Sequence, residues 1–446
     1  MDDVLITADK TMLAADSGRR SWPRIGLALL MCSYIVVCCA SFRMAYPYYR
    51  EYYILYDGAR LPHAIAAVTA FAAITPLFVF ARFSFGYFSG FYFYSMILGY
   101  LWLNSFSKFQ YDHTAAGLSA AVSAFVFLLP ALLITSPIRR PYVMSERAFE
   151  RLSVLIVLFC AATAAVAAAY NFRLVSANDI YDFRDQLQFP TMLNYSIGAA
   201  TSVLLPFAFA CFVTRNKWWQ AGIVLLISIS FYPSTLTKLA LFTPAWLVTL
   251  ALISRLFEAR ATAILSLLLP ILGGVILIST IGEPMRQYFN TVNVRMSIVP
   301  SSAMDVYSEY FTRHDPTHFC QISPLKPFVS CALEYPLGVE MQNNYALGNF
   351  NASLFATEGI ASVGMMFAPI SVFVCGLIIA LGNRLSAGLP ARFILISSAL
   401  VPQILLNVPL STVLLTHGLS ILFLLWYVMP RTIFEQKLAG QAAFTA

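Results

Sequence analysis

Charged residues are scarce in this chain. Asp, Glu, Lys and Arg make up 11% of the 446 residues, whereas hydrophobic residues make up 59%. No soluble domain of this length could keep so much apolar surface away from water. The composition therefore predicts one large helical membrane domain and argues against a string of soluble domains.

The net charge of +7 does not indicate a nucleic-acid partner. The basic residues are spread over many short loops, which is how the positive-inside rule distributes them in a membrane protein. We therefore expect the lipid bilayer, and no nucleic acid, as a partner.

Several motifs of soluble catalysis are absent. The chain has no Gly-x-x-x-x-Gly-Lys phosphate loop, no His-Glu-x-x-His and no Cys-x-x-Cys. These absences argue against an ATP-driven pump and against a zinc protease. We expect a protein that uses no cofactor and no metal.

The chain does contain many apolar runs of about 17–25 residues, the length that crosses the hydrocarbon of a bilayer as a helix. We predict an all-α polytopic membrane protein with about twelve transmembrane helices. The predicted spans lie near 25–42, 63–81, 85–105, 116–137, 152–170, 191–213, 218–233, 239–254, 263–282, 357–381, 392–408 and 412–429. They divide the chain into a tail 1–24, spans one to nine over 25–282, a large loop 283–350, spans ten to twelve over 351–430, and a tail 431–446.

The positions of Lys and Arg set the expected orientation. The loops between the predicted spans form two sets, one on each side of the membrane. Seventeen of the 28 Lys and Arg residues lie in the set that has fewer residues in total and that includes both termini. The positive-inside rule places that set in the cytoplasm. We therefore expect both termini inside, the stretch 283–350 outside, and a first span that is retained rather than cleaved as a signal peptide.

The stretch 283–350 is the polar exception among the apolar runs. It contains two of the five histidines and two of the eight cysteines, together with Arg286, Arg295 and Arg313. A loop this long between spans favours function. A transporter would more typically carry charges in mid-span, whereas the ionisable residues here lie mostly at outer ends. That placement favours an enzyme or a receptor at the outer membrane interface.

Three outer regions hold the candidate binding residues. They are 171–190 with Arg173 and Arg184, the turn 234–238 with Lys238, and the stretch 283–350 with Arg295. We expect these cations to converge on one anionic group, because Arg grips phosphate through a planar fork and Lys as a point charge. A lipid pyrophosphate at the membrane surface would need such a clamp.

Each candidate also has a structural alternative. Arg184 can pair with Asp182 and Asp185, and Arg295 can pair with Asp305 or Glu309. Lys238 can anchor a helix end at the headgroups, and Glu340 can cap a helix or pair with Lys326. His314 and His318 can be solvated loop residues. The tyrosines between Tyr46 and Tyr53 can form an interfacial belt, with stacking on sugar rings as the functional alternative.

Five short segments follow one another over about residues 150–430. They are Tyr181-Asp-Phe-Arg184, followed by Asn194-Tyr-Ser-Ile-Gly198 and Leu205-Pro206; Thr237-Lys238; Arg295-Met-Ser-Ile-Val-Pro300, leading into Tyr307-Ser-Glu-Tyr-Phe311; Gly338-Val-Glu340, followed by Gly348-Asn-Phe-Asn351 and Glu358-Gly359; and Asn407-Val-Pro-Leu-Ser-Thr412. By the order of these segments and their places among the predicted spans, the chain resembles the bacterial O-antigen polymerase family (Wzy). Members of that family join lipid-linked oligosaccharide repeat units at the periplasmic face.

One feature departs from that family. Its outer loops are often described as carrying an Arg, ten residues and then Gly. Eleven positions beyond Arg184 stands Tyr195, and eleven beyond Arg295 stands Val306. The arginines match in position, but a role that depends on the Gly does not carry over.

The resemblance implies a GT-C-like glycosyltransferase of the bacterial inner membrane, active in lipopolysaccharide biosynthesis. Its partners would be an undecaprenyl-pyrophosphate-linked glycan donor and acceptor, and a chain-length regulator protein. Arg184, Arg295, Lys238 and Arg173 would bind the pyrophosphate and stabilise its developing charge. A carboxylate or imidazole must deprotonate the acceptor hydroxyl: Glu340 is the first candidate, with His314 and Glu309 in reserve. Asn349, Asn351 and Tyr181 would contact the glycan.

Two other functions stay open at this point. An O-antigen ligase uses the same donor but transfers the glycan to lipid A core, and a polysaccharide flippase or other transporter belongs to a different class. Composition cannot separate the polymerase from the ligase.

Two cysteines, Cys320 and Cys331, share the outer stretch, whereas the other six lie in or beside spans. The periplasm is oxidising, so we predict a disulfide between them. The alternative is two free thiols.

Overall fold

The fold is seen in a computed structural model that describes residues 22–176, 179–180, 183, 186–322, 325, 327–331, 333–347, 350 and 357–434. These residues form helices and no named strand. The helices are α2 (Arg24–Met44), η1 (Tyr46–Tyr52), η2 (Gly58–Arg60), α3 (Leu61–Phe71), η3 (Ala72–Ile74), α4 (Pro76–Phe80), α5 (Phe85–Asn104), α6 (His113–Leu133), α7 (Glu146–Tyr170), α9 (Thr191–Ala199), η4 (Ala200–Leu204), α10 (Leu205–Thr214), α11 (Trp218–Ser230), α12 (Tyr232–Thr235), α13 (Lys238–Leu256), α14 (Ala259–Thr280), η5 (Glu283–Met285), α15 (Arg286–Phe289), η6 (Asn290–Ile298), α16 (Val299–Arg313), α17 (Leu337–Tyr345), α18 (Gly359–Ser386), α19 (Ala391–Ser397), α20 (Val401–Leu405), α21 (Leu410–Leu415) and α22 (Leu419–Val428).

Within the described residues, eight helical stretches are long and apolar enough to cross a membrane. They are Arg24–Met44, Gly58–Phe80, His113–Leu133, Glu146–Tyr170, Thr191–Thr214, Lys238–Leu256, Ala259–Thr280 and Gly359–Ser386. The all-α polytopic fold predicted from composition is therefore supported, with fewer such helices than the twelve spans expected.

The remaining four expected spans are helical but differ from long apolar helices. α5 has the length of a span, but Tyr, Ser and Gly alternate with its apolar residues. The span expected near 218–233 is the short α11 followed by α12, and the last two expected spans are each broken into two helices. Pro402 and Gly418 lie next to these breaks, where Pro cannot donate a helical hydrogen bond and Gly418 has φ +80°.

α5 lies at the centre of the packing and is buried from Phe85 to Leu103. It contacts α6, α16 and α18. Gly86 permits the closest approach, because a Cβ atom there would lie 2.1 Å from the carbonyl oxygen of Ala131 on α6. Asn383 of α18 closes this junction, accepting from the Gly86 N–H at 2.6 Å and donating to the same Ala131 oxygen at 2.8 Å.

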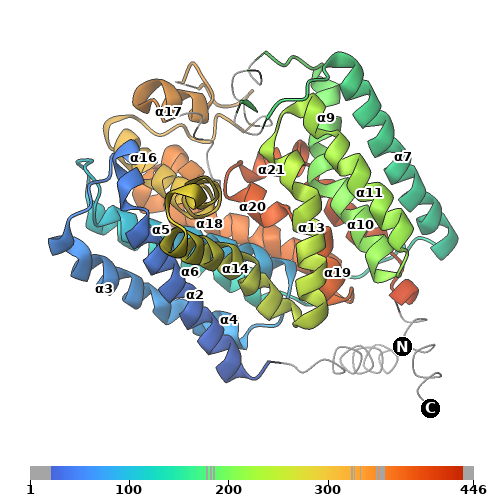
Figure 1. Ribbon diagram of the computed structural model, residues 1–446, viewed down its shortest axis with the longest axis horizontal. Coiled ribbons are helices and arrows are strands. Elements are labelled where there is room, and N and C mark those ends of the chain that lie inside the picture. Colours follow the sequence, from blue (N-terminus) through green and yellow to red (C-terminus); the bar gives the residue numbers. More distant parts are fainter. Residues whose placement is uncertain are drawn as a thin grey trace.

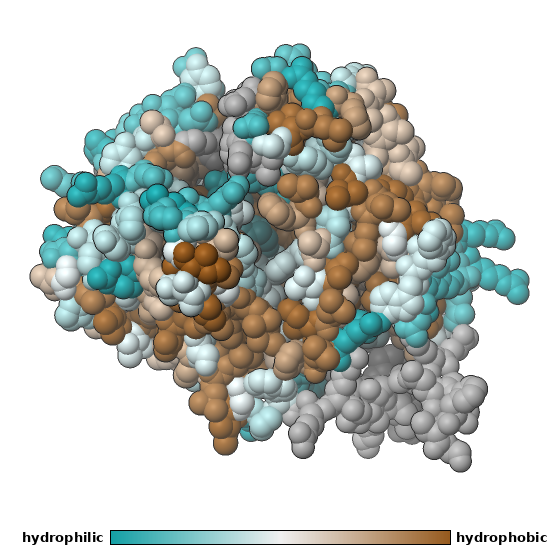
Figure 2. Space-filling model, in the orientation of Figure 1, coloured by the Kyte–Doolittle hydropathy of each residue, from teal (hydrophilic) through white to brown (hydrophobic). Residues whose placement is uncertain are grey.

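The helices form two groups (Figure 1). α2 to α6 lie on one side with α14 and α18, α7 to α11 lie on the other, and α13 and α19 lie between the two groups. Figure 2 shows hydrophobic side chains over α13 and α14, and hydrophilic side chains gathered above them around α16 and α17. This division suits a protein whose lower part lies in lipid.

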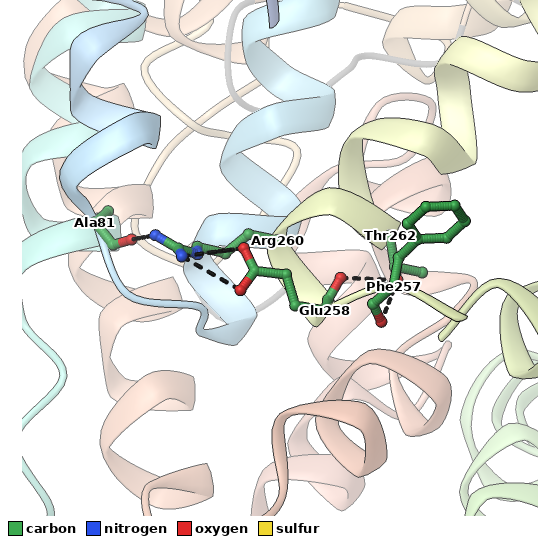
Figure 3. Close-up of polar contacts among 5 residues, drawn as sticks. All are labelled: Ala81, Phe257, Glu258, Arg260 and Thr262. Atoms are coloured by element: carbon green, nitrogen blue, oxygen red, sulfur yellow. Dashed lines mark hydrogen bonds and ion pairs between the residues drawn. The ribbon is translucent and has the colours of Figure 1, made fainter. Parts of the chain in front are cut away.

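The N-terminal end of α14 is held by a compact polar contact (Figure 3). Arg260 grips the carboxylate of Glu258 with two nitrogens, at 3.1 and 3.3 Å, and reaches the carbonyl of Ala81 at 3.5 Å. Thr262 donates to the carbonyl of Glu258 at 2.9 Å. These contacts tie the start of α14 to the end of α4, and so fix the helix whose far end leads into the polar stretch.

The polar stretch 283–350 differs from the loop expected. η5, α15, η6 and α16 carry the chain as nearly continuous helix from Glu283 to Arg313, and α17 adds another helix. α16 is buried from Pro300 to Tyr310 and packs on α5 and α18. Every fourth residue from Asn293 to Glu309 is polar, namely Asn293, Ser297, Ser301, Asp305 and Glu309. Residues at this spacing share one face of a helix, and that face is turned inward.

Candidate functional site

Lys238 is the first residue of α13. Thr237 caps this helix, since its hydroxyl accepts from the N–H of Ala240 at 3.3 Å. A cation at a helix N-terminus opposes the helix dipole by about 0.3–1 kcal/mol. Lys238 therefore lies where the dipole of its own helix disfavours a cation.

The turn before Lys238 is fixed by the segment after α7. The N–H of Arg173 donates to the carbonyl of Pro233 at 2.9 Å, Asn171 donates to Ser234 at 2.9 Å, and Tyr232 donates to Val175 at 2.6 Å. The Arg173 side chain is exposed and donates to Gln186 at 3.1 Å. The backbone of Arg173 thus positions the turn, while its guanidinium points to another partner.

Lys238 lines a cavity of about 520 Å³ between the start of α13 and the turn after α14. The remaining lining residues are Phe242, Glu283, Pro284, Arg286, Gln287, Asn290 and Thr291. Two cations from distant parts of the sequence, Lys238 and Arg286, therefore face one space. The first N–H groups of α13 add partial positive charge at the same place, as helix N-termini do in anion sites.

Arg286 is a site residue that sequence reasoning missed. Its guanidinium donates to the hydroxyl of Tyr48 at 3.1 Å and to Glu283 at 3.2 Å, and lies 5.7 Å from the centre of the Tyr48 ring. Hydrogen bonding to Tyr48 is the main cause that raises its pKa. The three-residue spacing of Glu283 and Arg286 is typical of an ordinary surface ion pair. Only the folded structure shows that both side chains line a cavity.

Arg295 lines a second, smaller cleft of about 170 Å³. The other lining residues are Tyr48, Glu51, Tyr52, Asn290, Val294 and Val299. Asn290 borders both spaces, so the two adjoin. The structure thus brings Lys238 and Arg295 to neighbouring clefts rather than to the single cavity expected of the clamp.

The helical segment that bears Arg295 is anchored by Asn293. This side chain is fully buried and donates to Ser41 of α2 and to the carbonyl of Ile271 of α14, both at 2.9 Å. The surrounding residues Asn290–Ile298 form a π-helix. π-Helical turns are frequent at functional sites, and this one presents Asn290 and Arg295 to the clefts.

The three residues expected to be catalytic lie together where the C-terminal end of α16, with Glu309 and the following His314, meets Glu340 of α17. The Tyr310 hydroxyl donates to Glu340 at 3.1 Å, and the Tyr310 carbonyl oxygen lies 2.9 Å from Nδ1 of His314, whose ring stacks on that of Tyr310 with ring centres 3.9 Å apart. Asn344 also donates to Glu340 at 3.1 Å. Glu309 is buried and accepts from Tyr345 and Arg313. We call this group, Glu309, Tyr310, His314, Glu340 and Tyr345, the acid cluster.

Burial and the neighbouring Glu340 carboxylate raise the pKa of Tyr310 to about 12. Tyr310 therefore keeps its proton at neutral pH and holds Glu340 as a hydrogen-bond donor. Such a bond orients a carboxylate and leaves its other oxygen for a substrate.

The acid cluster and the two clefts are separate regions. Glu309 follows Arg295 by 14 positions in a mainly helical segment, a rise of roughly 20 Å. The hydroxyl that attacks the carbon bonded to the pyrophosphate needs its base within hydrogen-bond reach. A base at Glu340, on α17, and a clamp at Arg295 therefore serve one transfer only if α17 moves toward the clefts.

Four predicted site residues lie outside the described residues: Arg184, Tyr181, Asn349 and Asn351. Their roles stay predictions. The disulfide expected between Cys320 and Cys331 is present, with Cα atoms 5.1 Å apart. The segment carrying Cys320 docks on the start of α18, where the N–H of Thr317 donates to Ala361 at 2.8 Å and that of His318 to Ser362 at 3.0 Å.

Asp305 is a second residue that sequence reasoning undervalued. It is fully buried, accepts from Tyr111, and its second oxygen has no hydrogen-bond partner among the described residues. Burial raises its pKa to about 7, with the neighbouring Glu309 acting in the same direction and Tyr111 and Ser107 opposing it. Tyr111 in turn contacts Tyr100 and Asn104 at 3.2 and 3.0 Å, so the carboxyl group ends a polar network.

The raised pKa of Asp305 predicts a pH-dependent stability. Between about pH 4 and pH 7 the folded protein holds a proton that the unfolded chain has lost, so stability falls as pH rises through that window and is flat above it. Asp305→Asn keeps the acceptor for Tyr111 and cannot ionise. We expect it to match the wild type near pH 4 and to exceed it by up to about 4 kcal/mol above pH 7.

Thermal unfolding in detergent from pH 4 to 8 measures this difference. Asp315→Asn, at an exposed aspartate, is the control and should track the wild type at each pH. A constant offset between Asp305→Asn and wild type across the range would contradict the prediction.

Comparisons with protein-family models, with curated proteins and with solved structures found no match to this chain.

Proposed function

We propose that this chain is a membrane glycosyltransferase that polymerises undecaprenyl-pyrophosphate-linked oligosaccharide repeat units at the periplasmic face of a bacterial inner membrane. The observation that carries the proposal is the cavity shared by Lys238 and Arg286, adjoined by the cleft of Arg295. Clustered cations at the border of a hydrophobic belt suit a ligand with an anionic head and a lipid tail. The resemblance of the sequence to the O-antigen polymerase family supplies the reaction.

In the proposed reaction, a hydroxyl oxygen of the acceptor glycan attacks the anomeric carbon of the donor. The bond from that carbon to the pyrophosphate oxygen breaks, and its electron pair leaves with undecaprenyl pyrophosphate. Lys238, Arg286 and Arg295 stabilise the charge that develops on the leaving group. The hydroxyl proton passes to a carboxylate within hydrogen-bond reach of the attacked carbon, and Glu340 takes this role in the proposal when α17 closes on the clefts.

The proposal includes the finer topology. In it, α5, α11 with α12, α19 with α20, and α21 with α22 cross the membrane beside the eight long apolar helices, which makes twelve crossings. Broken helices within a membrane are tolerated where they are buried in protein, and α20 is largely buried. Both termini are then cytoplasmic.

A reporter fused near Asp315 should score as periplasmic, and one fused near Glu146 as cytoplasmic, because Lys and Arg are denser in the loops on the Glu146 side. Alkaline phosphatase and green fluorescent protein fusions at both positions measure this. The reverse pattern would overturn the assignment of the clefts to the outer face.

Glycan chain length after deletion of the gene tests the function itself. Loss of a polymerase leaves lipopolysaccharide with a single repeat unit, loss of a ligase leaves none attached, and loss of a flippase accumulates the lipid-linked repeat on the cytoplasmic side. We expect the single-repeat pattern, and either of the other patterns would refute the proposal.

A further inference from the structure

We propose that the smaller cleft, lined by Tyr48, Glu51, Tyr52 and Arg295, binds one sugar ring, the one joined directly to the pyrophosphate. This inference rests on the proposed function, because it takes the neighbouring cavity to hold the pyrophosphate. It assigns to the cleft a ligand class, a pyranose, and it gives Glu51 and Tyr52 a role that the sequence did not suggest.

The side chains of the cleft suit a sugar in chemistry. A pyranose has an apolar face of C–H groups and a rim of hydroxyls. Tyr48 and Tyr52 supply aromatic surface for the apolar face, and Val294 and Val299 extend it. The Glu51 carboxylate accepts from hydroxyls, while Arg295 donates to hydroxyl oxygens. An aromatic wall with a few polar groups is the usual composition of a small-molecule site.

The aromatic rings are held in place before any ligand binds. Tyr48 receives a hydrogen bond from Arg286 at 3.1 Å and lies nearly parallel to Phe289, with ring centres 6.4 Å apart. Tyr52 packs against Phe350 with ring centres 6.4 Å apart. Rings fixed in advance lose little side-chain freedom on binding, which favours affinity.

The position of the cleft identifies which sugar it takes. Asn290 borders both the cleft and the cavity of Lys238 and Arg286. Arg286 also links the two, since it contacts both Glu283 in the cavity and Tyr48 in the cleft. A ligand that fills both spaces has a sugar ring directly attached to its phosphate groups, as a glycosyl pyrophosphate does.

Ligand-observed NMR on the full chain in nanodiscs tests the cleft without its lipid partner. The probes are the methyl glycosides of glucose, galactose, mannose and N-acetylglucosamine, observed by saturation transfer. A single ring without its phosphate should bind weakly, at roughly millimolar concentration, because small ligands gain limited energy per atom. We expect at least one glycoside to show transfer, strongest at its ring C–H protons.

Two variants locate the binding. Tyr52→Leu removes an aromatic face and Glu51→Gln removes a charged acceptor, and each should weaken binding about ten-fold or more, whereas Tyr52→Phe should retain most of it. Tyr335→Leu and Glu334→Gln are matched controls at exposed positions of the outer stretch and should bind as the wild type does. Lys238→Ala should also keep glycoside binding, because it changes only the neighbouring cavity.

The absence of transfer to all four glycosides, or equal transfer in wild type, Tyr52→Leu and Glu51→Gln, would overturn the proposal. Glycoside binding needs neither pyrophosphate nor transfer. If the chain-length test fails while glycosides bind at this cleft, the polymerase function falls and the sugar site stands. If polymer length depends on the chain but no glycoside binds, only the sugar site falls.

Discussion

Replacing Lys238 by alanine is expected to slow polymer formation roughly 10- to 150-fold. The loss of one charge-assisted contact costs about 1.5–3 kcal/mol, and the whole cost appears in the rate if the contact tightens as the leaving group gains charge. Arg286→Ala should have an effect of similar size. The ladder of lipopolysaccharide chain lengths in complemented deletion cells, together with transfer in a purified system, measures the loss.

The fold should tolerate the Lys238 change, because removing a cation from a helix N-terminus relieves an unfavourable interaction with the helix dipole. Lys217→Ala is the matched control, since Lys217 is half-exposed and paired with Glu150 at 3.6 Å, away from the clefts. Arg295→Lys should also be impaired, because it keeps the charge but loses the planar fork. Normal long-chain polymer in both Lys238→Ala and Arg286→Ala would disprove the pyrophosphate site.

Replacing Glu340 by glutamine is expected to lower turnover about 10²- to 10⁴-fold, the typical contribution of a general base, while donor binding stays largely intact. Glutamine has nearly the same shape and still accepts from Tyr310, whose hydroxyl lies 3.1 Å from the Glu340 carboxylate. Burial is the main cause that raises the pKa of Tyr310 and it is unchanged by the substitution, so the tyrosine stays a donor in both proteins. Turnover and binding of a lipid-pyrophosphate donor are measured separately.

Glu334→Gln, at an exposed glutamate in the same outer stretch, is the control for this variant and should leave turnover unchanged. If Glu340→Gln polymerises normally, the base does not lie in the acid cluster. Glu283, which lines the cavity of Lys238, and Glu51, which lines the adjoining cleft of Arg295, would then be the carboxylates to test next.

Much of the fold could be predicted from the sequence, because lipid admits long uniform apolar runs only as helices. Runs such as Ala259–Thr280 can be recognised as membrane-spanning helices from their composition alone. For α5 and the helices after α18, composition alone did not show where each helix breaks or how deeply it is buried. Their length, breaks and burial depend on tertiary contacts, such as that of Gly86 with Ala131, that no single stretch of sequence records.

The candidate site was predicted in part. Lys238 stood out as a cation at the boundary of two predicted spans, and Glu309, His314 and Glu340 do lie together as one cluster. Arg286 and Glu51 were missed, since each has ordinary surface neighbours in the sequence. The helix from Arg286 to Arg313 was missed because its polarity suggested a loop, although polar residues at every fourth position were a signal of a buried helical face.

That helix bears the cation clefts near its start and the acid cluster at its end. Their separation and their relative rotation are consequently set by one backbone, in whose α-helical part each residue adds about 1.5 Å and about 100°. Neither quantity can change without the other. A single-residue insertion in the α-helical part would rotate one region by about 100° relative to the other. We therefore expect the length of this helix to stay constant while side chains at its two ends vary.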